Sequence, residues 1–243
     1  RVIMGSEMWS EKLIEIRPIG TDSGVIVWEW RAWDHLVQDA DSTKPNYGVI
    51  ADHPELLDIN MGVLNSTTSD WLHFNSLDYN AELDQIMVSS HEVSEVYIID
   101  HSTTMEEAAS HTGGNSGRGG DLLYRWGNPQ NYDRGTAEDQ KFFEQHNLHW
   151  ISSTGRTLLF NNGVGRPGDD YSTVETFVIP AMVGNNYPLE TDSAYEPNSQ
   201  DWIYAADPPL SLFSIVQGGA QRLPNGNILY CNGTSGEFVE IDS

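Results

Sequence analysis

Short β-rich segments recur along the chain in a fixed order. Each copy begins with a strand beside a turn, and a second strand with many β-branched residues follows. The turn-flanked strands are ELDQIMVSS from Glu82, TGRTLLFNNG from Thr154 and PNGNILYCNG from Pro224. The strands that follow them lie at 95–100, 174–179 and 237–242, with KLIEI at 12–16 as an earlier copy.

Two further kinds of segment complete each copy. A strand marked by Trp or Tyr comes later, and a leading segment precedes each turn-flanked strand. The marked strands are GVIVWEWRAWD from Gly24, GDLLYRWGNP near Gly120 and DWIYAADPP from Asp201. The leading segments are DWLHFNSLDYN from Asp70, FFEQHNLHWI from Phe142 and SIVQGGAQRL from Ser214.

Four short strands in a repeat of about 70 residues, joined by Gly- and Asn-rich turns, are typical of a propeller blade. A β-sandwich would not predict this recurrence of segment order. We therefore expect an all-β fold, a single β-propeller domain over residues 1–243, with blade-like repeats near 1–69, 70–141, 142–213 and 214–243. About three and a half blades fit, and we expect the chain to be part of a larger propeller because it begins and ends inside a repeat.

Composition supports the β fold and excludes some classes of binding partner. Eight Trp, ten Tyr and seven Phe favour strands, and long helices are not expected. Acidic residues outnumber basic ones 36 to 12, for a net charge of −24. Such a charge repels nucleic acid and anionic membranes, and no apolar run is long enough to cross a bilayer. Cys231 is alone, so no disulfide within the chain is possible.

Histidines on the leading segments are the main candidates for chemistry. The first strand of a blade lines the central channel of a propeller. His73 and His146 are therefore expected at equivalent positions on neighbouring blades, facing one cavity, whereas the third copy has Gly218 and Gly219 there. His149 is expected to point to the opposite face of its strand and to pack against other side chains.

Metal and phosphate sites are not indicated by the sequence. An H-x-x-H pair on a strand does not supply the three or four ligands that zinc needs. The Gly-rich segment HTGGNSGRGGD at 111–121 lacks the G-K-[ST] ending of a phosphate-binding loop, so it is predicted to be a connection between two strands. We expect no cofactor and no metal. The sequence does not decide whether the channel holds calcium. Trp28, Trp30 and Trp126 are expected to pack between blades.

Five dissimilar motifs carry a family resemblance over roughly residues 24–242. They are the stretch from DWLHFNS to YIIDHSTT, GDLLYRWGNP, QHNLHWI, LLFNNG and GAQRLPNGNILYCNGTSGEFVEID. In this order they resemble the arylsulfotransferase family of β-propeller proteins. The resemblance implies a six-bladed propeller and a secreted or periplasmic bacterial enzyme. Such an enzyme moves a sulfuryl group from an aryl sulfate to a phenol, without a nucleotide donor, through a sulfohistidine.

Residue by residue, the resemblance implies channel histidines at His73 in DWLHFNS and His146 in QHNLHW, and a channel arginine at Arg166 after LLFNNG. Asn75 and Arg222 are further candidates for substrate binding. The sulfuryl centre suits these residue types, because imidazole is a competent nucleophile and proton donor and the guanidinium fork binds two oxygens at once.

One part of the family pattern differs in this sequence. The resemblance implies a nucleophilic histidine in a later blade, near or beyond the third leading segment, which here reads VQGGAQRLPNG. The nucleophile is then either outside these residues or one of His73 and His146. Two functions stay open: an arylsulfotransferase-like enzyme acting on small aryl sulfates and phenols, and a non-catalytic extracellular propeller that serves as a binding or structural module. The sequence does not indicate an oligomeric state.

Overall fold

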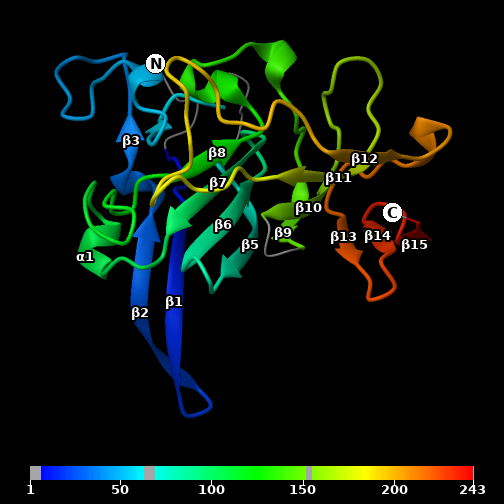
Figure 1. Ribbon diagram of the computed structural model, residues 1–243, viewed down its shortest axis with the longest axis horizontal. Coiled ribbons are helices and arrows are strands. Elements are labelled where there is room, and N and C mark those ends of the chain that lie inside the picture. The colour runs from blue at the N-terminus through cyan, green and yellow to red at the C-terminus, as the bar shows by residue number, and fades with distance from the viewer. Residues whose placement is uncertain (1–6, 63–68, 152–154, 243) are drawn as a thin grey trace.

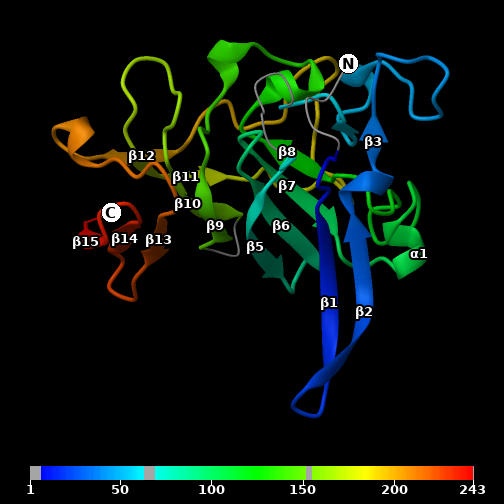
Figure 2. The ribbon, with the colours of Figure 1, turned by 180° about the vertical axis from the view of Figure 1, so that it is seen from behind.

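The computed structural model describes residues 7–62, 69–151 and 155–242. Within these ranges the chain is mostly β, which confirms the expected class. Figures 1 and 2 show the sheets following one another across the molecule, from the protruding β1–β2 hairpin to the C-terminal strands. The strands are β1 Lys12–Ile19, β2 Ser23–Arg31, β3 Leu36–Val37, β4 Leu57–Asp58, β5 Phe74–Asn80, β6 Gln85–Ser90, β7 Glu95–Asp100, β8 Tyr124–Trp126, β9 His146–Trp150, β10 Arg156–Asn161, β11 Thr173–Val178, β12 Trp202–Ala205, β13 Gly219–Arg222, β14 Ile228–Asn232 and β15 Glu237–Ile241.

Helices in the described residues are short. The α-helix α1 spans Met105–Ala108 and begins with a capping box in which Thr104 and Glu107 bond each other's backbone N–H. The 3-10 helices are Ala32–Asp34, Ile50–Asp52, Pro129–Tyr132, Ala137–Asp139 and Pro209–Ser211. None of these helices has the length and apolar character needed to span a membrane.

The predicted repeats correspond to antiparallel sheets whose strands pair in chain order. One four-stranded sheet is β5-β6-β7-β8 and another is β9-β10-β11-β12. The third copy forms the three-stranded sheet β13-β14-β15, and the N-terminal copy forms the β1-β2 pair. The expected order of leading strand, turn-flanked strand, following strand and marked strand is therefore confirmed in both complete copies.

Hydrophobic cores lie between consecutive sheets. Trp28 and Trp30 of β2 are buried against the face of the β5–β8 sheet, together with Val88. Trp126 is buried in the next core, where its ring stacks 4.3 Å from that of Phe177 on β11. A third core joins the β9–β12 sheet to β13–β15. The expectation that the three tryptophans pack between sheets is confirmed.

The first strands of successive sheets are joined by side chains that bond to the neighbouring backbone. The Ser76 hydroxyl on β5 accepts from the Leu148 N–H on β9 at 3.0 Å. The amide oxygen of Asn147 accepts from the Ala220 N–H on β13 at 2.9 Å. Because the same edge of each sheet meets the next one, residues at the starts of β5, β9 and β13 come together.

Candidate functional site

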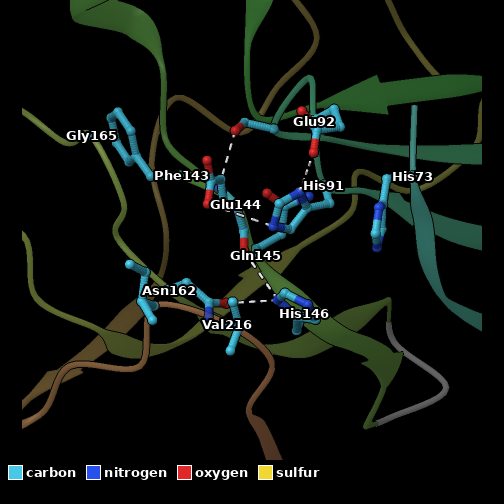
Figure 3. A network of polar contacts seen from close by, with 12 residues as sticks. His73, His91, Glu92, Phe143, Glu144, Gln145, His146, Asn162, Gly165 and Val216 are labelled. Atoms are coloured by element: carbon cyan, nitrogen blue, oxygen red, sulfur yellow. Dashed lines mark hydrogen bonds and ion pairs between the residues drawn. The ribbon is translucent and has the colours of Figure 1, made fainter. Parts of the chain in front are cut away.

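Three histidines cluster where β5, β6 and β9 meet. His91, in the turn after β6, lies between His73 and His146, with ring centroids 5.0 Å and 5.1 Å away. Figure 3 shows His91 between the other two rings, with Glu92 and Glu144 on either side of it. The structure thus brings His73 and His146 into one cluster through a third histidine, which sequence reasoning missed. That the two residues face one cavity stays a prediction.

Antiparallel pairing explains why His91 reaches this place. The end of β6 pairs with the start of β5, so the residue that follows β6 lies beside the residue that precedes β5. The His91 N–H donates to the His73 carbonyl at 3.1 Å, and the Glu92 N–H donates to the Leu72 carbonyl at 3.3 Å. A histidine directly after the second strand of a repeat was therefore the signal that could have identified this position.

The expected equivalence of His73 and His146 is wrong by two residues. The left-handed residue that opens each first strand is His73 (φ 52°), Glu144 (φ 59°) and Gln217 (φ 55°). In the second copy the Gly163 N–H donates to the Phe143 carbonyl, the same bond that Glu92 makes to Leu72 in the first. Glu144 is therefore the residue of the second copy that is equivalent to His73. The two histidines meet because adjacent first strands lie side by side.

The third leading segment has glycines for reasons of packing. A Cβ at Gly218 would lie 2.6 Å from the ring of Phe160, and one at Gly219 would lie 2.9 Å from the side chain of Asn147. Gly218 also has a φ of 124°, which disfavours other residues. Close approach of β13 to β9 and β10 therefore excludes a larger side chain at these two positions.

The tautomer of His146 follows from Asn162, which is fully buried. The Asn162 amide nitrogen donates to the carbonyls of Ser214 at 2.8 Å and Gln217 at 2.6 Å, so its oxygen faces His146. That oxygen lies 2.8 Å from Nδ1 of His146, and the Glu144 carbonyl lies 3.1 Å from the same atom. Nδ1 faces two acceptors and must carry the proton. The lone pair of neutral His146 is therefore on Nε2.

Burial lowers the pKa of His146, with the hydrogen bond to Asn162 opposing this effect and His91 adding to it. The lowered pKa means that the neutral imidazole persists at mildly acidic pH, because burial disfavours the charged form. His146 is thus a neutral base whose available nitrogen is Nε2.

Carboxylates face both ring nitrogens of His91. Nδ1 lies 3.3 Å from Glu92 and Nε2 lies 3.6 Å from Glu144. The hydrogen bond from His91 is the main factor that lowers the pKa of Glu92. Burial is the main factor that raises the pKa of Glu144, and the charge of Glu92 contributes. Both ring nitrogens of His91 are thus directed at carboxylates in the middle of the cluster.

His73 forms a histidine–carboxylate pair. Its Nδ1 lies 2.7 Å from Asp70, and its side chain is 44% exposed. With Asp70 holding the Nδ1 proton, Nε2 of His73 is the nitrogen that can exchange a proton with a molecule entering from solvent.

The other predicted site residues make contacts of their own. The guanidinium of Arg166 stacks 4.0 Å from the Tyr171 ring and donates to Thr173 at 3.2 Å. Its buried Nε has no partner among the described residues. Asn75 donates to the Gln145 carbonyl at 2.7 Å and so joins β5 to the segment before β9. Arg222 is exposed at the end of β13.

His149 does not belong to the cluster. Its Nδ1 faces the Asn147 carbonyl at 3.0 Å, and its ring lines a groove along β13 with Gly219 and Phe238. The two histidines of HNLHW therefore lie in different surroundings.

His73, His91 and Glu92 have ligand atoms within 4.8 Å of one another, so this group could hold a metal ion. The whole cluster also has a geometry that fits proton transfer. His146 offers the lone pair of Nε2, His91 is flanked by carboxylates, and His73 pairs with Asp70.

One comparison with known proteins identifies a family. A family model described as arylsulfotransferase (ASST) matches residues 10–242, which is nearly the whole chain. No curated protein matches the chain.

Proposed function

The chain belongs to the arylsulfotransferase family, and from this membership we propose that it transfers a sulfuryl group from an aryl sulfate to a phenol through His146. The observation that carries the proposal is the bond of Asn162 to Nδ1, which leaves the lone pair of His146 on Nε2. A buried, neutral imidazole of this kind is a competent nucleophile.

In the first half-reaction Nε2 of His146 attacks the sulfur atom. A nitrogen–sulfur bond forms, and the bond from sulfur to the aryl oxygen breaks. The electron pair of that bond goes to the leaving phenolate, which takes a proton from Nε2 of His73. Asp70 supports this step by holding Nδ1 of His73 at 2.7 Å, because a carboxylate stabilises the imidazolium that gives up the proton.

In the second half-reaction the acceptor phenol gives its proton back to His73. The resulting phenolate oxygen attacks sulfur, and the nitrogen–sulfur bond breaks. His146 returns to its neutral form, so protons and charges balance over the cycle. His91 lies beside both steps, with Glu92 and Glu144 facing its two nitrogens.

Arg166 is the proposed ligand of the sulfuryl oxygens. Its guanidinium lies against Gly163, directly after Asn162, where a Cβ would be 2.7 Å from Nε. The unpartnered Nε is a donor that a sulfuryl oxygen would satisfy, and charge-assisted bonds of this kind are strong. Asn75 and Arg222 stay as further proposed contacts of the substrate.

The sheets are proposed to be blades of a six-bladed propeller in a bacterial protein that is secreted or periplasmic. Apolar side chains on both outermost sheets support the propeller: Ile16 on β1 is 51% exposed and Phe238 on β15 is 70% exposed. Each inner sheet covers such a face of its neighbour, so additional blades would bury these residues as well.

A second candidate function is a binding module without transfer. It is favoured by the carboxylates of Asp70, Glu92 and Glu144 around the cluster, because they repel the anionic sulfate that a transferase must bind. A cationic or hydrogen-bonding ligand would fit such surroundings better than an aryl sulfate.

Incubation of the protein with p-nitrophenyl sulfate and an excess of phenol tests the choice between the two functions. We expect release of p-nitrophenol that depends on the phenol, and formation of phenyl sulfate in equal amount. Without phenol, mass spectrometry of the protein should detect one added SO₃ group on the peptide that contains His146. Binding of aryl sulfate with neither product nor adduct would favour the binding module.

The role of Asn162 predicts a shift in the pH dependence of transfer. Only neutral His146 attacks, so the rate is lost as pH falls through its pKa, and the acidic limb should lie below the ordinary value of 6.5. In Asn162→Asp a carboxylate replaces the amide oxygen and stabilises the imidazolium. The limb should then move up by about 1–3 pH units, and the rate at pH 6 should fall while the rate at pH 9 is largely kept.

The matched control for this experiment is Asn198→Asp, which adds the same charge at an exposed position. Its pH profile should equal that of the wild type. A folded Asn162→Asp protein with an unshifted acidic limb, or a wild-type limb well above pH 6.5, would show that His146 is not the titrating nucleophile.

A further inference from the structure

A second group of histidines shares no residue with the proposed transfer site. His35 comes between the first 3-10 helix and β3, whereas His111 and Asp121 belong to the connection between β7 and β8. The Nδ1 atoms of His35 and His111 lie 2.8 Å and 2.7 Å from the same oxygen, Oδ1 of Asp121. Three potential ligand atoms from distant parts of the chain therefore converge on one point.

The contacts of the two ring nitrogens of His35 direct one of them at Asp121. Nε2 of this fully buried ring lies 2.8 Å from the Ala108 carbonyl, so Nε2 carries a proton and donates. Nδ1 is then the ring nitrogen directed at the carboxylate of Asp121, 2.8 Å from its Oδ1. The same carboxylate oxygen is approached by Nδ1 of His111 at 2.7 Å. A divalent metal would satisfy Asp121 and both histidines at once.

His35 is held rigidly in this orientation. Its ring stacks on Trp30 with centroids 5.5 Å apart and planes 2° from parallel. The indole N–H of Trp30 donates to the Gly120 carbonyl at 2.7 Å. A Cβ at Gly120 would lie 2.6 Å from Nε2 of His35, so the loop can approach only with glycine there. Ligands fixed by packing and by a backbone carbonyl at the second ring nitrogen are typical of metal sites.

The group opens to a cavity of about 710 Å³, lined by His111 and Asp121 and by other polar and aromatic residues. Asp34 and Glu55 add negative charge to its wall, and the exposed side chains of Trp33 and Tyr47 flank it. A cation bound to the three ligands would therefore keep a coordination position open to the cavity.

We propose that His35, His111 and Asp121 bind one divalent transition-metal ion of the zinc type. Two imidazole nitrogens and one carboxylate oxygen form the three-ligand set that zinc uses when a fourth position is open to water. The ligand atoms lie within 4.8 Å of one another, so small side-chain shifts bring them to bonding distance. The ion holds the 109–121 connection against the N-terminal part of the chain and gives the cavity a Lewis-acidic centre.

The sequence predicted no metal, because an H-x-x-H pair on a strand supplies too few ligands. His35, His111 and Asp121 were not considered, since their spacing matches no motif. The test uses the full chain, freed of metal with a chelator and titrated calorimetrically with Zn²⁺ and, in parallel, spectroscopically with Co²⁺. We expect one equivalent of Zn²⁺ to bind, and Co²⁺ to give the visible absorption of a tetrahedral site. His111→Ala should weaken binding at least tenfold without unfolding the protein, since this side chain is 60% exposed. Asp121→Asn should weaken it similarly.

A control variant distinguishes this site from the other group of potential ligands. His91→Gln removes a member of the group formed by His73, His91 and Glu92 and should leave Zn²⁺ affinity and the Co²⁺ spectrum unchanged. The proposal is overturned if the wild type binds no Zn²⁺, if folded His111→Ala and Asp121→Asn bind it like the wild type, or if His91→Gln abolishes binding. Because the readouts are metal affinity and a spectrum, they are independent of sulfuryl transfer.

Discussion

Replacing His146 with alanine is expected to lower kcat for transfer from p-nitrophenyl sulfate by more than about 10⁴-fold, the scale of loss when an enzyme is deprived of its nucleophile. Tertiary structure should persist, because the ring is only partly buried and its bonds go to Asn162 and to a backbone carbonyl. KM should change little, since the imidazole acts on the sulfur atom and not on the aryl ring. Initial rates of p-nitrophenol release, with the added SO₃ group as a second readout, measure the effect.

His149→Ala is the matched control for this substitution. It removes another imidazole, three residues further along β9, whose ring lines the groove beside β13. We expect its kinetic constants to equal those of the wild type. Equal loss in the two variants, or full activity in folded His146→Ala, would contradict the assignment of the nucleophile.

The sheet architecture could be predicted because each strand is specified locally. Alternation and β-branched residues set the strand in EVYIID, which forms β7 at 95–100 as expected, and the tryptophans of β2 and β8 pack between sheets as expected. The parallel pair of β3 with β4 was not predicted. Its strands have only two residues each, and their pairing depends on how segment 32–62 packs against its neighbours.

The site was predicted less completely because it depends on where turns place single residues. The sequence pointed to His73 and His146, since both lie on leading segments. It did not reveal that the left-handed residue of the second copy is Glu144, a shift of two positions that only backbone conformation shows. His91 was missed because it follows the second strand, and antiparallel pairing with β5 brings it to the cluster.

Stability of the first complete sheet is expected to depend on the buried ion pair of Arg125 with Glu95. Both side chains are fully buried, and Arg125 donates to the two carboxylate oxygens at 2.9 Å and 2.5 Å. Its remaining nitrogen donates to the Leu56 carbonyl at 2.9 Å, and its guanidinium lies 4.3 Å from the ring of Tyr132. The pair thus joins β7 and β8 to the chain before β5.

Arg125→Met should lower the free energy of unfolding by about 3–5 kcal/mol, because removal of one partner leaves the buried carboxylate of Glu95 without a counter-charge, held only by hydrogen bonds from Tyr97 and Asn131. Arg31→Met is the control: Arg31 pairs with Glu29 at the surface, where its side chain is 57% exposed, and a loss of about 0–1 kcal/mol is expected. Equilibrium unfolding in urea, followed by tryptophan fluorescence, measures both. Replacing both partners by Arg125→Met and Glu95→Leu should destabilise less than the two single changes added together, since no lone charge stays buried. If Arg125→Met lost as little unfolding free energy as Arg31→Met, the core would have adjusted to the carboxylate of Glu95, and the pair would not hold the sheet together.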